Sequence, residues 1–189
     1  MKDWESLYQQ GDTKWDRGTA NAALPHLIAQ LTPGASVLVP GCGRGHEVVE
    51  LATNGFAVTA LDIAPSAISH LASTLAQHQL HARLVRNDLF AFTPDQPFDA
   101  IYEQTCLCAI DPTQRHDYEL RLHRWLKPGG LLFALFMQTN SDDGPPFHCD
   151  LPTMRRLFAE KSWQWPTDVP QSIPHSNGRF ELAHTLQRI

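Results

Sequence analysis

The stretch that decides the fold runs from residue 36 to residue 62 and reads SVLVPGCGRGHEVVELATNGFAVTALD. It begins with the apolar run Ser36–Pro40, which predicts a buried strand, and a glycine-rich turn then leads into a helix predicted at His46–Thr53. A second strand is predicted at Ala57–Leu61, directly before Asp62. A strand, a helix and another strand in this order predict a right-handed crossover between parallel strands.

The same alternation continues along the chain. Further strands are expected at Ala82–Val85, Phe98–Tyr102, Leu131–Met137 and Arg179–Gln187, and further helices at Pro65–Gln79, Gln114–Leu126 and Thr153–Lys161. We therefore predict an α/β protein with a doubly wound, mostly parallel sheet that is covered by helices on both faces. Sheets of this kind bind ligands at the carboxyl ends of their strands, so the residues that follow each strand are the candidate site residues.

Composition narrows the function classes. A length of 189 residues predicts one domain spanning residues 1–189. The 15 Lys and Arg residues against 20 Asp and Glu residues give a net charge of −5, and neither half of the chain is a basic arm, which disfavours a nucleic-acid binder. No signal peptide or membrane span is expected, because no long apolar run occurs. Four scattered cysteines predict neither a disulfide scaffold nor a metal site. We expect a cytoplasmic protein that is monomeric.

The loop after the first strand, Val39–Gly45, has the sequence VPGCGRG. Glycine permits a tight turn and lets a ligand approach the backbone, and the helix that follows offers unpaired N–H groups. Position 46 is His, so the third glycine of a dinucleotide-binding G-x-G-x-x-G motif is missing. The pattern indicates a nucleotide-type loop, with an ordinary tight turn as the alternative.

Two further strand ends carry acidic residues. Asp62 lies 21 residues beyond Gly41, where a carboxylate accepts hydrogen bonds from ribose hydroxyls, although it is also placed to cap the helix that begins near Pro65. After the third strand, Asp88 is placed to accept from the amino group of an adenine, and Leu89 to pack on its ring. Together these strand ends carry the groups that a nucleoside requires.

Several ordered segments resemble one known family. They are Gly11–Asp16, Val39–Gly45, Leu61–Ala67, Cys106–Pro112 with Arg115, Leu126–Gly130 and Gly144–Phe147. On these segments the chain resembles class I S-adenosylmethionine-dependent methyltransferases, and more narrowly the thiopurine S-methyltransferase family with its halide, thiocyanate and thiol methyltransferase relatives. The resemblance spans about residues 4–185. It implies a seven-stranded, Rossmann-like sheet with an antiparallel last strand, and S-adenosylmethionine as the cofactor, with S-adenosylhomocysteine as the product.

The resemblance also implies roles for individual residues. The cofactor contacts that it implies are Gly41 and Gly43 under the methionine moiety, Asp62 at the ribose, Ile63, Asp88 and Leu89 around the adenine, and Glu103 at the amino acid end. Trp15 is expected to come from an N-terminal lid segment, residues 1–30, that folds over this site. The alternative for Trp15 is ordinary packing of an amphipathic N-terminal helix.

The methyl acceptor is predicted to be a small, soft nucleophile: a thiol, a thiopurine, hydrosulfide, a halide or thiocyanate. Expected acceptor contacts are Cys106, Phe147 and Arg179. His148 is the one candidate general base, with a solvated loop histidine as the alternative. A soft nucleophile needs little base, because free thiols with a pKa of about 8.5 are partly ionised at neutral pH. Two other functions stay open: an NAD-linked oxidoreductase, and a nonenzymatic S-adenosylmethionine binder.

Overall fold

The computed structural model describes residues 2–141, 143–175 and 178–189. The chain forms two compact units, Met1–Thr93 and Pro94–Ile189, which we call unit 1 and unit 2. Met1, which belongs to the predicted lid segment 1–30, lies outside the described residues.

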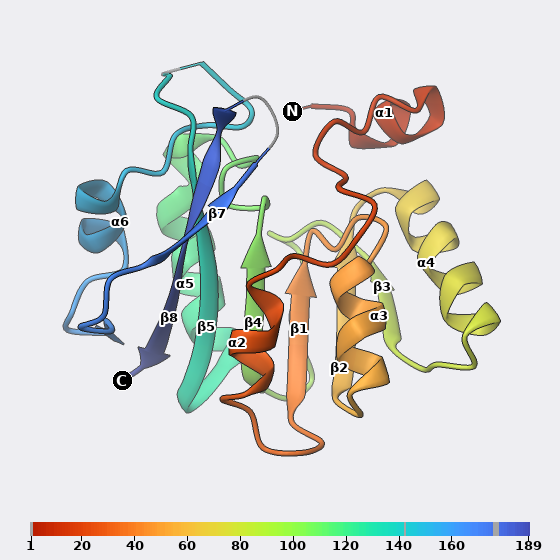
Figure 1. The fold of residues 1–189 in the computed structure, drawn as a ribbon, viewed down its shortest axis with the longest axis horizontal. Helices are drawn as coiled ribbons and strands as arrows, with labels where there is room; N and C mark the ends of the chain where they lie inside the picture. Colours follow the sequence, from red (N-terminus) through yellow and green to blue (C-terminus); the bar gives the residue numbers. More distant parts are fainter. Residues whose placement is uncertain (1, 142, 176–177) are drawn as a thin grey trace. The chain divides into compact units, whose positions relative to one another are not determined.

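Unit 1 is a parallel three-stranded sheet with four helices (Figure 1). Its elements in chain order are α1 (Trp4–Gln10), α2 (Leu24–Ile28), β1 (Ser36–Pro40), α3 (His46–Thr53), β2 (Ala57–Asp62), α4 (Pro65–Gln77) and β3 (Arg83–Arg86). The central strand β2 pairs in parallel with β1 on one side and with β3 on the other. The carboxyl ends of β1 and β2 therefore lie side by side, and α1 lies at this end of unit 1.

Sequence features account for these elements. The interior of β1 is fully apolar and buried, as a strand covered on both faces requires. Helix α4 begins at Pro65, whose missing N–H costs nothing in the first turn, and it buries Leu71 and Leu75, which lie one turn apart. Helix α3 packs against β2, and α4 packs against β2 and β3. The helices thus hold the strands whose ends carry the candidate site residues.

Unit 2 is a mixed sheet. Its elements are β4 (Phe98–Gln104), the 3-10 helix η1 (Pro112–Gln114), α5 (Arg115–Trp125), β5 (Leu126–Gln138), α6 (Leu151–Leu157), β6 (Trp163–Gln164), β7 (Gln171–Pro174) and β8 (Phe180–Arg188). Strands β4 and β5 are parallel, whereas β8 runs antiparallel to β5. The short strands β6 and β7 both pair antiparallel with β8.

The predicted fold class is confirmed, including the antiparallel strand near the C-terminus. The described residues contain eight strands, where the resemblance implied seven: the six strands predicted by residue range, and the short strands β6 and β7, which pair with β8. Strand β5 begins at Leu126, since this residue pairs with Phe98 across a bulge. Helix α6 begins two residues before the predicted start, because the Asp150 carboxylate caps it by accepting from the Thr153 N–H at 2.8 Å.

One buried polar contact fastens β6 to α5. The indole Nε1 of Trp163 donates a hydrogen bond of 2.6 Å to Oε1 of Glu119, and both side chains are buried. The Trp163 ring also makes edge contacts with Phe158 and His123. Burial of a carboxylate costs free energy unless a donor satisfies it, so this bond is a constraint on the packing of unit 2.

We expect Trp163→Phe to keep the ring packing but to leave Glu119 without its donor. The free energy of unfolding, measured by urea denaturation, should fall by about 1–3 kcal/mol, the usual range for an orphaned buried acceptor. Gln164→Ala, at the exposed neighbouring position, is the control and should change little. The double change Trp163→Phe with Glu119→Leu should recover much of the loss. A Trp163→Phe protein as stable as wild type would refute the assignment.

Candidate functional site

The glycine loop after β1 has the backbone that its sequence predicts. Gly41, Gly43 and Gly45 have φ angles of +58°, +54° and +74°, a region that L side chains rarely adopt. A Cβ on Gly43 would stand 2.9 Å from the Tyr8 hydroxyl, and a Cβ on Gly45 would stand 2.5 Å from Cδ1 of Leu71. The loop therefore needs glycine for its dihedral angles and also for close approach.

Asp62 holds this loop in place. Its Oδ2 accepts from the Gly43 N–H at 2.9 Å, and its Oδ1 accepts from the Ala64 N–H at 2.9 Å. The side chain is 8% exposed, and burial raises the pKa of the Asp62 carboxyl, against the lowering effect of these N–H groups. The N-cap residue of α4 is Ala64, so Asp62 forms a turn ahead of the helix and is not its cap. Each carboxylate oxygen retains further accepting capacity for a ligand hydroxyl.

The residues expected around an adenine lie at the ends of β2 and β3. Ile63 is 42% exposed, which is unusual for an isoleucine next to a buried strand. Asp88 is half-buried, and its Oδ1 accepts from the Phe90 N–H at 2.7 Å, which closes a turn beside half-buried Leu89. The exposed apolar surface and the partly occupied carboxylate leave room for ligand contacts, and those contacts stay predictions.

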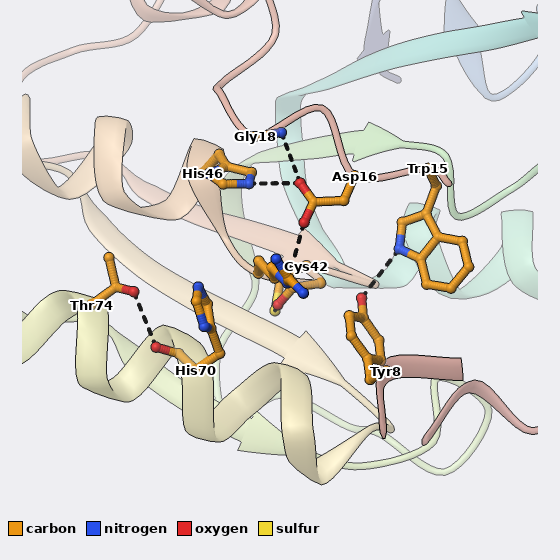
Figure 2. A network of polar contacts seen from close by, with 10 residues as sticks. Tyr8, Trp15, Asp16, Gly18, Cys42, His46, His70 and Thr74 are labelled. Atoms are coloured by element: carbon orange, nitrogen blue, oxygen red, sulfur yellow. Dashed lines mark hydrogen bonds and ion pairs between the residues drawn. The ribbon is translucent and has the colours of Figure 1, made fainter. Parts of the chain in front are cut away.

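An aromatic cluster from the N-terminal segment lies at the glycine loop (Figure 2). The Trp15 ring makes edge contacts with Trp4 and Tyr8, at centroid distances of 5.3 and 5.5 Å. Its Nε1 donates to the Tyr8 hydroxyl at 3.3 Å. That hydroxyl lies against Gly43. Burial, reinforced by the negative charge of Asp62, raises the pKa of Tyr8, so its hydroxyl stays protonated.

Tyr8 was not among the residues predicted from the sequence. The available signal was the spacing of Trp4 and Tyr8, which are four residues apart and so share one face of α1. A helix of seven residues with no buried side chain gives no periodic pattern strong enough to predict it. The structure thus adds a phenol hydroxyl to the glycine loop.

Glu103, at the end of β4, points into unit 2. Its Oε1 accepts from the Leu107 N–H at 2.6 Å, and the side chain is 1% exposed. Burial, together with the nearby charge of Glu181, raises the pKa of Glu103 to about 7, while the Leu107 N–H and Arg115 oppose the shift. The predicted contact of Glu103 with a cofactor stays a prediction; in unit 2 its carboxylate organises the turn after β4.

Two of the expected acceptor contacts lie on segments that meet. Cys106 is a buried residue of the turn after β4, and the carbonyl oxygen of Cys108 in this turn accepts from the Phe147 N–H at 2.7 Å. The Phe147 ring packs directly over Gly144, where a Cβ would collide with it. Arg115 Nη1 donates to the His148 carbonyl oxygen at 3.0 Å. The turn and the loop 144–148 therefore form one local structure.

His148 and Arg179 are placed less favourably for their predicted roles as general base and acceptor contact. The Nδ1 of His148 accepts from the Thr139 N–H at 3.1 Å, so the neutral ring carries its proton on Nε2. In this tautomer Nε2 donates a hydrogen bond and does not accept a proton. Arg179 is exposed, one residue before β8. The roles of His148 and Arg179 stay predictions.

The described residues contain neither a membrane-spanning helix nor a cluster of metal ligands. Over residues 2–141, 143–175 and 178–189, no helix combines the length and apolar character needed to cross a bilayer. In the same ranges, no three His, Cys, Asp or Glu side chains gather in a way that would hold a metal ion. All four cysteines are buried thiols.

Comparison with known proteins agrees with this geometry. Residues 1–185 match the family model described as thiopurine S-methyltransferase. Thiocyanate methyltransferase 1 of Brassica oleracea is 35% identical over 186 residues, covering 95% of this chain and 82% of the relative. A probable thiol methyltransferase 2 of Arabidopsis thaliana is 34% identical over 160 residues, covering 82% of this chain and 70% of the relative.

A solved structure shares the fold. The Burkholderia thailandensis 1,6-didemethyltoxoflavin-N1-methyltransferase, solved with bound 1,6-didemethyltoxoflavin and S-adenosylhomocysteine, superposes with a TM-score of 0.79 at 23% identity, covering 98% of this chain and 85% of that one.

The raised pKa of Glu103 predicts a pH-dependent stability. A carboxyl with a pKa near 4.5 in the unfolded chain and about 7 in the folded one stabilises the fold when protonated. That stability is complete below about pH 4.5 and is lost as the pH rises through 7. Between pH 4.5 and 8, this group should lower the free energy of unfolding of wild type by up to about 3 kcal/mol. In Glu103→Gln this contribution to the pH dependence should be absent. Urea denaturation at several pH values measures it, with the exposed Glu160→Gln as control. Parallel pH profiles for Glu103→Gln and wild type would contradict the assignment.

Proposed function

The chain belongs to the thiopurine S-methyltransferase family, and from this premise we propose that it transfers the methyl group of S-adenosylmethionine to a small, soft nucleophile. The enzyme is thus an S-adenosylmethionine-dependent methyltransferase. The acceptors to consider are a thiol, a thiopurine, hydrosulfide, a halide and thiocyanate, because curated relatives are named for thiocyanate and thiol methylation.

The observation that carries the proposal is the pair of adjacent strand ends in unit 1. At the end of β1, Gly41 and Gly43 have positive φ angles and bring no side chain of their own to the loop that a ligand would approach. At the end of β2, the buried Asp62 carboxylate is fixed by two backbone N–H groups and keeps accepting capacity. These groups fit a cofactor with an amino acid chain and a ribose, and exposed Ile63 fits its adenine.

We assign the residues as follows. Gly41, Gly43, Asp62, Ile63, Asp88, Leu89 and Glu103 serve the cofactor; Trp15 closes over it; and Cys106, Phe147 and Arg179 serve the acceptor. The segment before residue 30 acts as a lid, which the cluster of Trp4, Tyr8 and Trp15 at the glycine loop supports. His148 is the weak candidate for a general base, because its Nδ1 already accepts a hydrogen bond from the Thr139 N–H.

Methyl transfer to a soft nucleophile requires little from the protein beyond binding and orienting the two reactants. When bound, S-adenosylmethionine would supply an electrophilic methyl group on a sulfonium, with the thioether of S-adenosylhomocysteine as the leaving group of an in-line transfer to the acceptor. The chain's own residues bind and orient the two reactants and exclude water, which accounts for most of the acceleration in such a transfer. A thiolate or halide arrives already ionised, so a missing general base is no obstacle. The half-buried rings of Trp15 and Phe147 each offer apolar, polarisable surface, which suits a soft, weakly hydrated acceptor.

The competing functions make different predictions. An NAD-linked oxidoreductase is disfavoured by His46 at the position of the third loop glycine and by the family membership. A nonenzymatic binder would bind the cofactor without turnover. We further propose that the two units act as one methyltransferase domain, and that the protein is a cytoplasmic monomer without nucleic-acid partners, as its charge and composition suggest.

Cofactor binding is the first test. We expect the purified protein to bind S-adenosylhomocysteine with micromolar or better affinity in calorimetry, and not to bind NAD. Asp62→Ala removes both the carboxylate acceptors and the tether of Gly43, so it should weaken binding by about 1–3 kcal/mol. Asp117→Ala, an exposed carboxylate on α5, is the control and should bind as wild type does. Binding of NAD in place of S-adenosylhomocysteine would overturn the proposal.

The acceptor is identified by a methyl-transfer screen with labelled S-adenosylmethionine. The panel should contain small thiols, thiopurines, hydrosulfide, iodide and thiocyanate, together with oxidised selenium and tellurium species. We expect turnover with at least one soft acceptor, at a rate that rises with pH through the pKa of a thiol acceptor and is flat for a halide. Cofactor binding without turnover of any acceptor would favour the nonenzymatic binder.

A further inference from the structure

Asp16 accepts a hydrogen bond within its own N-terminal segment and contacts two further side chains, Arg44 of the glycine loop and His46 at the start of α3 (Figure 2). Its Oδ1 accepts from the Gly18 N–H at 2.9 Å and lies 2.8 Å from Nε2 of His46. Its Oδ2 lies 3.2 Å from Nε of Arg44. The Asp16 side chain is only 10% exposed, so the contacts are poorly screened by water.

The two side chains that Asp16 contacts lie where the glycine loop ends and α3 begins. Arg44 and His46 flank Gly45, the residue at which the glycine loop turns into α3. Asp16 itself directly follows Trp15. Burial works to raise the pKa of Asp16, but the Gly18 N–H, His46 and Arg44 outweigh it and lower the pKa, so the carboxylate is charged at neutral pH. A charged side chain of the N-terminal segment is thus bound to the loop that it covers.

A second anchor holds the same segment at its other end. The Glu5 carboxylate of α1 accepts from the Ser66 backbone N–H at 2.9 Å and from the Ser66 hydroxyl at 2.6 Å, at the start of α4. The segment is therefore fixed to the first turns of α4 and α3. Between the two anchors stand the rings of Tyr8 and Trp15, with the Tyr8 hydroxyl against Gly43.

We propose that Asp16 is a positioning residue: its contacts with Arg44 and His46 hold the N-terminal segment closed over the glycine loop and so set the orientation of Trp15 and the affinity for the cofactor. This role rests on the proposed function, because it presumes that the cofactor binds at the glycine loop. Asp16 touches no reacting atom. It acts by keeping most molecules in the binding-competent arrangement, and apparent affinity falls in proportion to the competent fraction.

The test compares Asp16→Asn with Asp12→Asn. Both changes remove one negative charge from the same segment, but the Asp12 side chain is 45% exposed and pairs, at 3.3 Å, with a Lys14 side chain that is 85% exposed. We expect Asp16→Asn to raise the dissociation constant of S-adenosylhomocysteine about tenfold in calorimetry, the change that a tenfold smaller closed fraction produces. Binding stoichiometry should remain that of wild type. Asp12→Asn should leave both quantities unchanged.

Two measurements distinguish a positioning role of Asp16 from a purely structural one. Loss of folded protein would lower the stoichiometry and the kcat at saturating cofactor, whereas an opened segment raises the KM for the cofactor and spares kcat. Hydrogen exchange of residues 4–18 without ligand should be faster in Asp16→Asn than in Asp12→Asn. If Asp16→Asn does not fold, His46→Ala, which removes one contact at the same carboxylate, replaces it.

The outcomes distinguish the two proposals. Binding of S-adenosylhomocysteine by wild type, with unchanged dissociation constant and exchange in Asp16→Asn, overturns the role of Asp16 and leaves the proposed function standing. Absence of binding by wild type overturns both. Asp16→Asn and His46→Ala should also combine non-additively, because they affect the same contact. Fully additive effects on the dissociation constant would count against the contact between them.

Discussion

The site in unit 1 depends on one buried carboxylate. Asp62 accepts from the N–H of Gly43 in the loop after β1 and from the N–H of Ala64 in the turn after β2, so a single side chain fixes two neighbouring strand ends. A buried carboxylate with two backbone donors is tolerable; without them its desolvation would be costly. The Tyr8 hydroxyl, which accepts from the indole N–H of Trp15, lies against Gly43. The N-terminal cluster therefore packs against a loop that the Asp62 contacts hold.

The other acids that shape the site act in the same way. Glu103 accepts from the Leu107 N–H, Glu5 from Ser66, and Asp16 from Gly18. Each of these carboxylates accepts at least one hydrogen bond from the chain's own backbone. The net charge of −5 therefore contains little information about the acceptor, because several of the negative groups are buried.

Some helices and strands could be predicted from the sequence and others could not. Strand β1 and helix α3 have the predicted bounds, because a glycine loop between an apolar run and a helical pattern leaves little freedom. The shift of α6 comes from Asp150, a cap that was visible in the sequence but not used. Helix α2 and strands β6 and β7 were not predicted. They have only two to five residues and are stabilised by pairing or packing against distant parts of the chain.

Sequence alone determined the α/β class, the glycine loop, the acid after β2 and, by resemblance, the family, since these are written in local patterns of a few consecutive residues. Tertiary structure alone decided which way the side chains face. It placed Tyr8 on Gly43, bound Asp16 to Arg44 and His46, turned Glu103 inward and engaged Nδ1 of His148. The physical reason is that hydrogen-bond partners and burial depend on residues many positions away, which no local pattern specifies.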